Sequence, residues 1–140
     1  MASVYERIGE SGFERLVAGF YRRVRNDDLL GPMYPPDDWD AAEERLRDFL
    51  VGRFGGPMRY VERRGHPRLR MRHMPFRIDS AARDRWLDLM GAAMAEAKLP
   101  DDVAAVLTPY FVQTADHMRN APDGEPGPAD LLNRRLPPDG

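Results

Sequence analysis

The chain contains no cysteine among its 140 residues. Disulfide scaffolds, thiolate zinc sites, iron–sulfur clusters and cysteine nucleophiles are therefore excluded. An excess of positive charge is also missing, because 21 lysines and arginines stand against 23 aspartates and glutamates, for a net charge of -2. Bulk charge therefore gives no reason to expect nucleic acid or an anionic membrane as a partner.

A long hydrophobic run is missing as well. The longest uncharged stretch, Val103 to Ala115, is too short to span a bilayer. Glu6 and Arg7 lie where a signal peptide would need its apolar stretch. We therefore expect a cytoplasmic protein without a membrane span. A length of 140 residues suits one domain with a hydrophobic core of its own.

Familiar catalytic motifs are missing too. The three histidines, His66, His73 and His117, include no pair at the spacing that lets one helix face bind zinc. The sequence has no glycine-rich phosphate loop, G-x-S-x-G elbow or kinase signature. The six arginines between residues 59 and 73 could form a phosphate-binding strip, but a solvated surface explains them as well.

Apolar residues recur at helical spacing in four stretches, and none alternates like a strand, so the sequence predicts an all-α fold. The first long helix is expected to begin at Ser11, because Ser11 and Glu14 have the spacing of a capping box. Its predicted core face consists of Phe13, Leu16, Val17, Phe20, Tyr21 and Val24. The other expected helices are a short one over 29–33, one from Asp37 or Asp38 to the breaker Gly55-Gly56-Pro57, and two over Ser80–Lys98 and Asp101–Arg119.

Parts of the chain do not fit this regular pattern. Residues 58–74 are expected to be irregular apart from one or two helical turns over Arg68–His73. Pro109 is expected to bend the last helix or to leave a 3₁₀ break one turn upstream. Residues 121–140 are rich in proline and glycine, so we expect a globular domain over 1–120 and a mostly disordered tail after it.

His73 lies at the end of a short predicted helix that Pro75 stops. A metal that needs only one protein ligand suits such a histidine, and haem iron is such a metal because the porphyrin supplies four nitrogens. An ordinary core or surface histidine is the alternative that the residue alone leaves open. By themselves, Tyr21 and Trp86 also fit a core role, since both lie on apolar helix faces.

One set of residues is distinctive: Gly55-Gly56-Pro57, Tyr60, the run Gly65-His66-Pro67-Arg68-Leu69-Arg70-Met71-Arg72-His73-Met74-Pro75-Phe76, and Trp86. With these residues, the chain from Val4 to Asn120 resembles the group II truncated haemoglobins, the type common in actinobacteria. The resemblance implies a shortened globin in which two antiparallel helix pairs pack crosswise, two on two, around haem b. The chain departs from the family at Gly9-Glu10, where paired glycines are usual, so the geometry of that corner stays open.

The resemblance also implies roles for single residues. His73 would be the proximal ligand of the haem iron, with its second ring nitrogen on the carbonyl of Leu69. Tyr21, Tyr34 and Trp86 would surround the opposite, distal side of the iron. The Tyr21 hydroxyl and the Trp86 indole N–H would donate to bound dioxygen, which carries partial negative charge, and Tyr34 would orient Tyr21 or donate itself.

The same resemblance implies the remaining haem contacts. Ala42 and Leu46 would lie over the distal side, where the small Ala42 leaves ligand access unobstructed. Cationic or hydroxyl groups would neutralise or solvate the two propionates. The expected contacts are the propionate partners Arg45, Tyr60 and Arg72 and the haem-packing residues Leu69, Phe76 and Met90.

We therefore expect a haem protein that binds dioxygen, carbon monoxide and nitric oxide reversibly at ferrous iron. The resemblance also permits oxidation of nitric oxide or reduction of peroxide. Because the sequence has no flavin or nicotinamide motif, either reaction would need an external electron donor. The alternative is a haem-based gas or redox sensor without turnover. The sequence leaves open whether the protein is an enzyme and whether it forms a homodimer.

Overall fold

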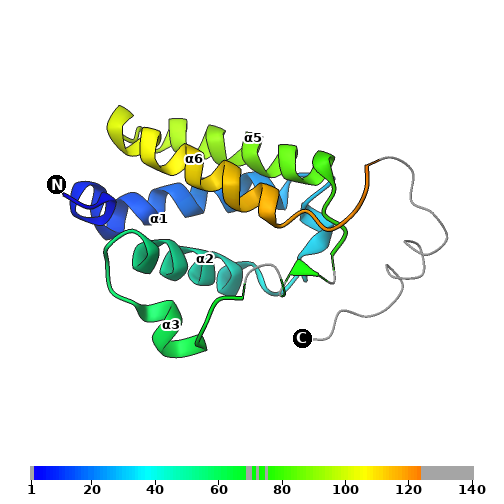
Figure 1. The fold of residues 1–140 in the computed structure, drawn as a ribbon, viewed down its shortest axis with the longest axis horizontal. Coiled ribbons are helices and arrows are strands. Elements are labelled where there is room, and N and C mark those ends of the chain that lie inside the picture. Colours follow the sequence, from blue (N-terminus) through cyan, green and yellow to red (C-terminus); the bar gives the residue numbers. More distant parts are fainter. Residues whose placement is uncertain (1, 69–70, 72, 75, 124–140) are drawn as a thin grey trace.

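The computed structural model describes residues 2–68, 71, 73–74 and 76–123. Its helices are labelled as in Figure 1: α1 (Val4–Arg25), the 3₁₀ helix η1 (Gly31–Met33), α2 (Trp39–Arg53), α3 (Arg59–Arg64), α5 (Ser80–Glu96) and α6 (Asp101–His117). No strand occurs in the described part, in agreement with the predicted all-α fold. Residues 124–140 of the predicted tail lie outside the described residues, as do Leu69 and Arg72.

Two pairs of helices make up the fold (Figure 1). Helices α5 and α6 lie side by side, while α1 packs against both α2 and α5 and α3 packs against α2. The short connection between α5 and α6 makes that pair antiparallel. This is the arrangement expected of a two-on-two globin. Among the described helices, none is long and apolar enough to cross a membrane.

The predicted apolar face of α1 forms the centre of the core. Phe13, Leu16, Val17, Phe20 and Val24 are all 0% exposed. Their spacing of three and four residues places them on one side of the helix, which faces α2 and α5 at the same time. The prediction of this face from the sequence is therefore confirmed.

Helix α1 consists of two helical stretches joined at Gly9, and the predicted start of the first long helix near Ser11 agrees with the second stretch. Helix α1 begins at Val4, and the hydroxyl of Ser3 caps it by accepting a bond from the backbone N–H of Glu6 at 3.1 Å. The helix is interrupted at Gly9, whose φ of 67° and ψ of -177° are not helical. Only glycine adopts this conformation readily. The corner that the sequence left open is therefore a kink at Gly9, and the stretch predicted from Ser11 is the part of α1 after it.

Gly55, in the Gly55-Gly56-Pro57 breaker after α2, also allows the start of α1 to pack closely. Gly55 has a φ of 104°, and a Cβ atom at this position would lie 2.6 Å from the side chain of Ser3. Next to it, the backbone N–H of Tyr5 donates to the carbonyl of Phe54 at 3.0 Å. Glycine at position 55 thus ends α2 and lets the N-terminal segment pass close to the chain.

The expectation that residues 58–74 are irregular is wrong for Arg59–Arg64, which forms helix α3. Arg59 pairs with Glu10 of α1 at 2.6 Å, and Arg63 pairs with the buried Asp48 of α2 at 3.3 Å. These partners come from distant parts of the sequence, so local periodicity could not show them. Arg59 and Arg63 thus form ion pairs within the fold. This argues against their membership in the phosphate-binding strip that the sequence allowed.

The ends of the later helices mostly follow the predictions. Asp79 caps α5 by accepting a bond from the N–H of Ala82 at 3.0 Å, as expected. Asp38 precedes α2, but its carboxylate accepts a bond from Arg45 at 2.7 Å and not from a helix N–H. Helix α6 continues through Pro109 without the predicted 3₁₀ break.

Two glycine substitutions test the kink in α1. Gly9→Ala should lower the free energy of unfolding by about 1–3 kcal/mol, because alanine is strained in this backbone conformation. A Cβ at position 9 meets no atom within 4 Å, so crowding does not contribute. The control is Gly91→Ala in α5, where a Cβ also meets nothing and the backbone is helical. This control should raise the free energy of unfolding by about 1 kcal/mol. Urea denaturation measures both, and effects of the same sign would contradict the assignment.

Candidate functional site

Three aromatic side chains meet where α1 lies beside the loop that leads into α2. The ring of Tyr34 stacks on Trp39 with a centroid distance of 5.0 Å, and it meets the edge of Tyr21 at 5.7 Å. Tyr21 and Trp39 are 6.3 Å apart. The structure therefore brings together Tyr21 and Tyr34, two of the three predicted distal residues.

The hydroxyl groups of the two tyrosines form a hydrogen bond. Burial raises the pKa of Tyr21 well above its usual value of 10.0, and the nearby Tyr34 and the hydrogen bond with it raise this pKa further. Burial also raises the pKa of Tyr34, while the same hydrogen bond lowers it. Burial therefore favours the neutral, protonated form of both tyrosines.

Trp86, the third predicted distal residue, is linked to this cluster through Phe20. The Phe20 ring lies 5.2 Å from the ring of Tyr21 and 5.0 Å from that of Trp86. On its other side, Trp86 contacts Phe111 of α6 at 5.5 Å. Adjacent residues of α1 thus contact the tyrosine pair and the tryptophan of α5.

Helix α2 presents a row of apolar side chains of which the middle one is less buried than its neighbours. Ala42, Leu46 and Leu50 follow one another at intervals of one helical turn and so lie on the same face. Ala42 and Leu50 are 2% and 1% exposed, whereas Leu46 between them is only partly buried. Apolar surface at Leu46 is thus left uncovered in the middle of an otherwise covered face.

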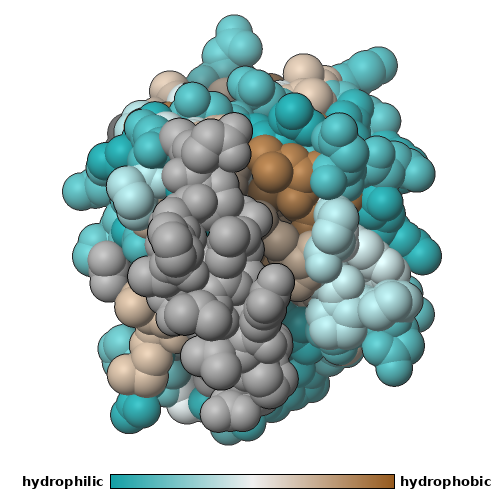
Figure 2. Space-filling model, turned by 90° about the vertical axis from the view of Figure 1, so that its right-hand side faces the viewer, coloured by the Kyte–Doolittle hydropathy of each residue, from teal (hydrophilic) through white to brown (hydrophobic). Residues whose placement is uncertain are grey.

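Helix α5 has the same feature. Ala82 and Met90 are 3% and 1% exposed, and Trp86, one turn from each, is only partly buried. Figure 2 shows one end of the molecule, where hydrophobic atoms are visible within a mostly hydrophilic surface. An apolar group of the size and chemistry of a porphyrin would gain from covering the surface at Leu46 and Trp86.

His73 lies in the segment between α3 and α5, in a helical conformation and partly buried. Of the described residues in the turns predicted over Arg68–His73, Met71 and His73 are helical, but Arg68 has a φ of 47° and is not. The N–H of Phe76 donates to the carbonyl of His73 at 3.0 Å, so the chain turns directly after the histidine. A single imidazole in a segment of its own fits haem, whose iron needs one protein ligand.

The other predicted haem contacts are placed as follows. Tyr60 is buried on α3 with its ring 5.6 Å from that of Phe49, and Met90 is fully buried in the core. Arg45 pairs with Asp38, and this hydrogen bond raises the pKa of Arg45. Phe76 is partly buried next to His73. The haem contacts of all these residues stay predictions, and Leu69 and Arg72 lie outside the described residues.

Trp39 is a member of the aromatic cluster that the sequence analysis did not assign to the site. The sequence places it on the apolar side of α2, but its contact with Tyr34 depends on how the intervening Pro35-Pro36 loop turns. The guanidinium of Arg25 lies 5.5 Å above the Trp39 ring, at the outer side of the cluster. The number of aromatic rings around the tyrosine hydroxyls is thus larger than predicted.

Comparisons with known proteins agree with this geometry. Residues 3–120 match the model of the family described as bacterial-like globin. The chain is 40% identical to a group 2 truncated haemoglobin of Bacillus subtilis (strain 168), over 86% of this chain and 91% of that protein.

Solved structures give the same result. A thermostable haemoglobin from the actinobacterium Thermobifida fusca is 50% identical and superposes with a TM-score of 0.83, over 87% of this chain and all of that one. A truncated oxygen-avid haemoglobin from Bacillus subtilis is 39% identical with a TM-score of 0.81, over 85% of this chain and all of the other. The chain therefore belongs to the bacterial-like globin family, within the group II truncated haemoglobins.

Proposed function

We propose that this protein binds haem b through His73 and holds dioxygen reversibly on the opposite side of the haem, next to Tyr21, Tyr34 and Trp86. Two features carry the proposal, the apolar surface that stays uncovered at Leu46 and Trp86 and the buried Tyr21, which Phe20 links to Trp86. The similarity to an oxygen-avid haemoglobin supports it. When bound, the haem supplies an iron position that holds a small gas molecule.

The distal residues of this chain supply donors for such a ligand. Tyr21 stays protonated at neutral pH because burial raises its pKa, and Trp86 can act only as a donor through its indole N–H. Tyr34 shares a hydrogen bond with Tyr21, so it can orient the Tyr21 hydroxyl or donate its own O–H. A hydrogen bond to a charged group is worth about 1.5–3 kcal/mol, which corresponds to a ligand release slowed about tenfold to a hundredfold.

Slow release favours chemistry on the ligand over its transport. We therefore propose that the protein oxidises nitric oxide with dioxygen or reduces peroxide, with electrons from an external donor. The tyrosines and Trp86 would contribute by donating hydrogen bonds. The rings of Phe20 and Trp39, which pack against the tyrosines, would exclude water. The test is to supply a reductase and to measure the rate at which the protein consumes nitric oxide.

The role of His73 can be tested by replacing its side chain with free imidazole. His73→Gly should lose the absorption spectrum of histidine-ligated ferrous haem and should regain it when imidazole is added, because the substitution leaves space for that ligand. His66→Gly, at an exposed histidine in the same segment, should keep the spectrum unchanged. A His73→Gly protein with the wild-type spectrum and no added imidazole would contradict the proposal.

The donors can be tested through the rate of ligand release. Tyr21→Phe and Trp86→Phe should each raise the dissociation rate of dioxygen by about tenfold to a hundredfold, since each removes one hydrogen-bond donor. Tyr110→Phe is the matched control, because the Tyr110 ring packs on Phe54, away from the tyrosine pair. Stopped-flow measurement of dioxygen release distinguishes the variants. Equal rates in Tyr21→Phe, Trp86→Phe and the wild type would exclude these donors.

The raised pKa of Tyr21 predicts a loss of stability in alkali. In the unfolded chain Tyr21 ionises near its usual value of 10.0, but in the folded protein it ionises only at higher pH. Its stabilising contribution is therefore complete below pH 10.0 and is lost as the pH rises from there through the folded pKa. The free energy of unfolding, measured by denaturant at increasing pH, should fall less steeply for Tyr21→Phe than for the wild type. Parallel curves would show that Tyr21 is not held in its neutral form.

A further inference from the structure

Asn120, just beyond the end of α6, contacts both ends of the segment that follows His73. Its side-chain N–H groups donate to the carbonyl of His73 at 3.1 Å and to that of Phe76 at 2.8 Å. Its side-chain oxygen accepts a bond from the N–H of Ile78 at 2.8 Å. The backbone N–H of Asn120 donates in turn to the carbonyl of Ile78 at 2.8 Å.

The chemistry of an asparagine amide matches these three backbone groups. The amide has two N–H donors and one carbonyl oxygen, and all three functions are used here. Aspartate would have the right length but no donor for the two carbonyls. Glutamine would have the right groups but an additional methylene. The partly buried position therefore selects for asparagine by both size and polarity.

Of the two carbonyls that Asn120 contacts, that of His73 lies at the end of a helical turn and that of Phe76 lies in the bend that follows. Backbone carbonyls in the last turn of a helix have no partner within the helix, so another group has to satisfy them. Asn120 does this for His73, whose carbonyl also accepts the N–H of Phe76. The end of α6 thus provides the cap for the turn that holds the histidine.

The residues after Asn120 extend this attachment. We call residues 120–123 the strap. Arg77 donates to the carbonyl of Pro122 at 2.6 Å, and the N–H and hydroxyl of Ser80 donate to the carboxylate of Asp123 at 2.9 and 3.0 Å. The strap therefore contacts the chain from His73 to the first residue of α5.

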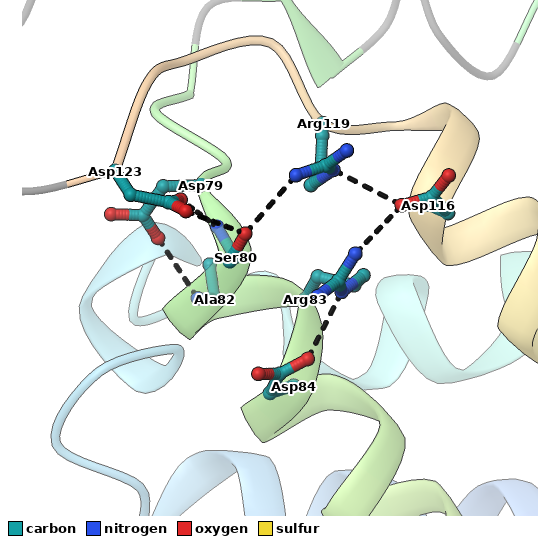
Figure 3. A network of polar contacts seen from close by, with 8 residues as sticks. All are labelled: Asp79, Ser80, Ala82, Arg83, Asp84, Asp116, Arg119 and Asp123. Carbon is teal, nitrogen blue, oxygen red and sulfur yellow. Dashed lines mark hydrogen bonds and ion pairs between the residues drawn. The ribbon is translucent and has the colours of Figure 1, made fainter.

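Ionic contacts join α5 and α6, the two helices whose ends the strap connects. Figure 3 shows Arg83 of α5 and Arg119 both directed toward Asp116 of α6, at 2.7 and 3.1 Å. Arg119 also donates to the hydroxyl of Ser80 at 3.1 Å. The beginning of α5 and the end of α6 are thus held together at the place where the strap starts.

We propose that Asn120 is a positioning residue for the proximal histidine. It fixes the main chain at His73, and with it the direction of the imidazole, relative to α5 and α6. The same two helices carry Trp86 and Phe111, so the strap relates the proximal side of the haem to the distal tryptophan. The inference rests on the proposed role of His73 as haem ligand, because groups beyond the ligand orient it and tune its bond to the metal.

Two substitutions of Asn120 in the full chain test the proposal. Asn120→Asp keeps the size and the acceptor for Ile78 but turns a negative oxygen toward the carbonyls of His73 and Phe76. Asn120→Ala removes all three side-chain bonds. The control is Asn26→Asp, the same chemical change at an exposed amide that donates to the single carbonyl of Arg22 at 2.9 Å.

The main readout is the iron–histidine stretching band in the resonance Raman spectrum of the deoxygenated ferrous protein. Both Asn120 variants should shift and broaden this band. Asn120→Asp should release haem to an acceptor protein about tenfold faster, which corresponds to the loss of two hydrogen bonds, and Asn120→Ala, which loses three, at least as fast. Asn26→Asp should leave the band and the release rate at wild-type values.

The outcomes separate this inference from the proposed function. A wild-type protein without an iron–histidine band would overturn both. A wild-type band that stays unchanged in Asn120→Asp would overturn only the role of Asn120. If Asn120→Ala fails to fold, Asn120→Asp decides by itself, because it retains one side-chain bond. A lower thermal midpoint of Asn120→Asp without a shifted band would mean that Asn120 only stabilises the fold, which also overturns the proposal.

Discussion

The packing of α1 against two helices at once determines the geometry of the candidate site. Phe20 and Tyr21 are neighbours in the sequence, so the helix directs one ring toward Trp86 on α5 and the other toward Tyr34 and Trp39 beside α2. A rotation of α1 about its axis would disrupt both sets of contacts. The closely packed apolar face of the helix resists such a rotation. The position of a polar hydroxyl is thus set by hydrophobic packing.

The small net charge conceals specific ion pairs between distant parts of the chain. The bond from Arg59 lowers the pKa of the Glu10 carboxyl and attaches α3 to α1. Asp48 is buried, so the charge of Arg63 beside it compensates a carboxylate that has lost its water. Exposed pairs contribute little to the free energy of folding, about 0–1 kcal/mol each. Here their main effect is to orient α3 against α1 and α2, together with the packing of Tyr60 on Phe49.

Features that depend on local order could be predicted from the sequence, and features that depend on distant contacts could not. The apolar face of α1 and the cap at Asp79 follow from spacing and residue type within a few positions. The kink was left open, because a glycine permits an unusual φ without requiring it. The roles of Trp39 and Asn120 could not be predicted, because their contacts with Tyr34 and His73 form only in the folded chain. The position of His73 at the end of a short predicted helix made it a candidate ligand, whereas Tyr34 was indicated only by the family resemblance.

The strap has a consequence for the order in which the protein is made. His73 and Asn120 are 47 positions apart in the chain, so a ribosome releases the histidine well before the amide that caps its turn. Until α6 has emerged and docked on α5, the carbonyl of His73 lacks the hydrogen bond from the Asn120 amide. This contact between the segment of His73 and the end of α6 is therefore among the last to form as the chain is synthesised.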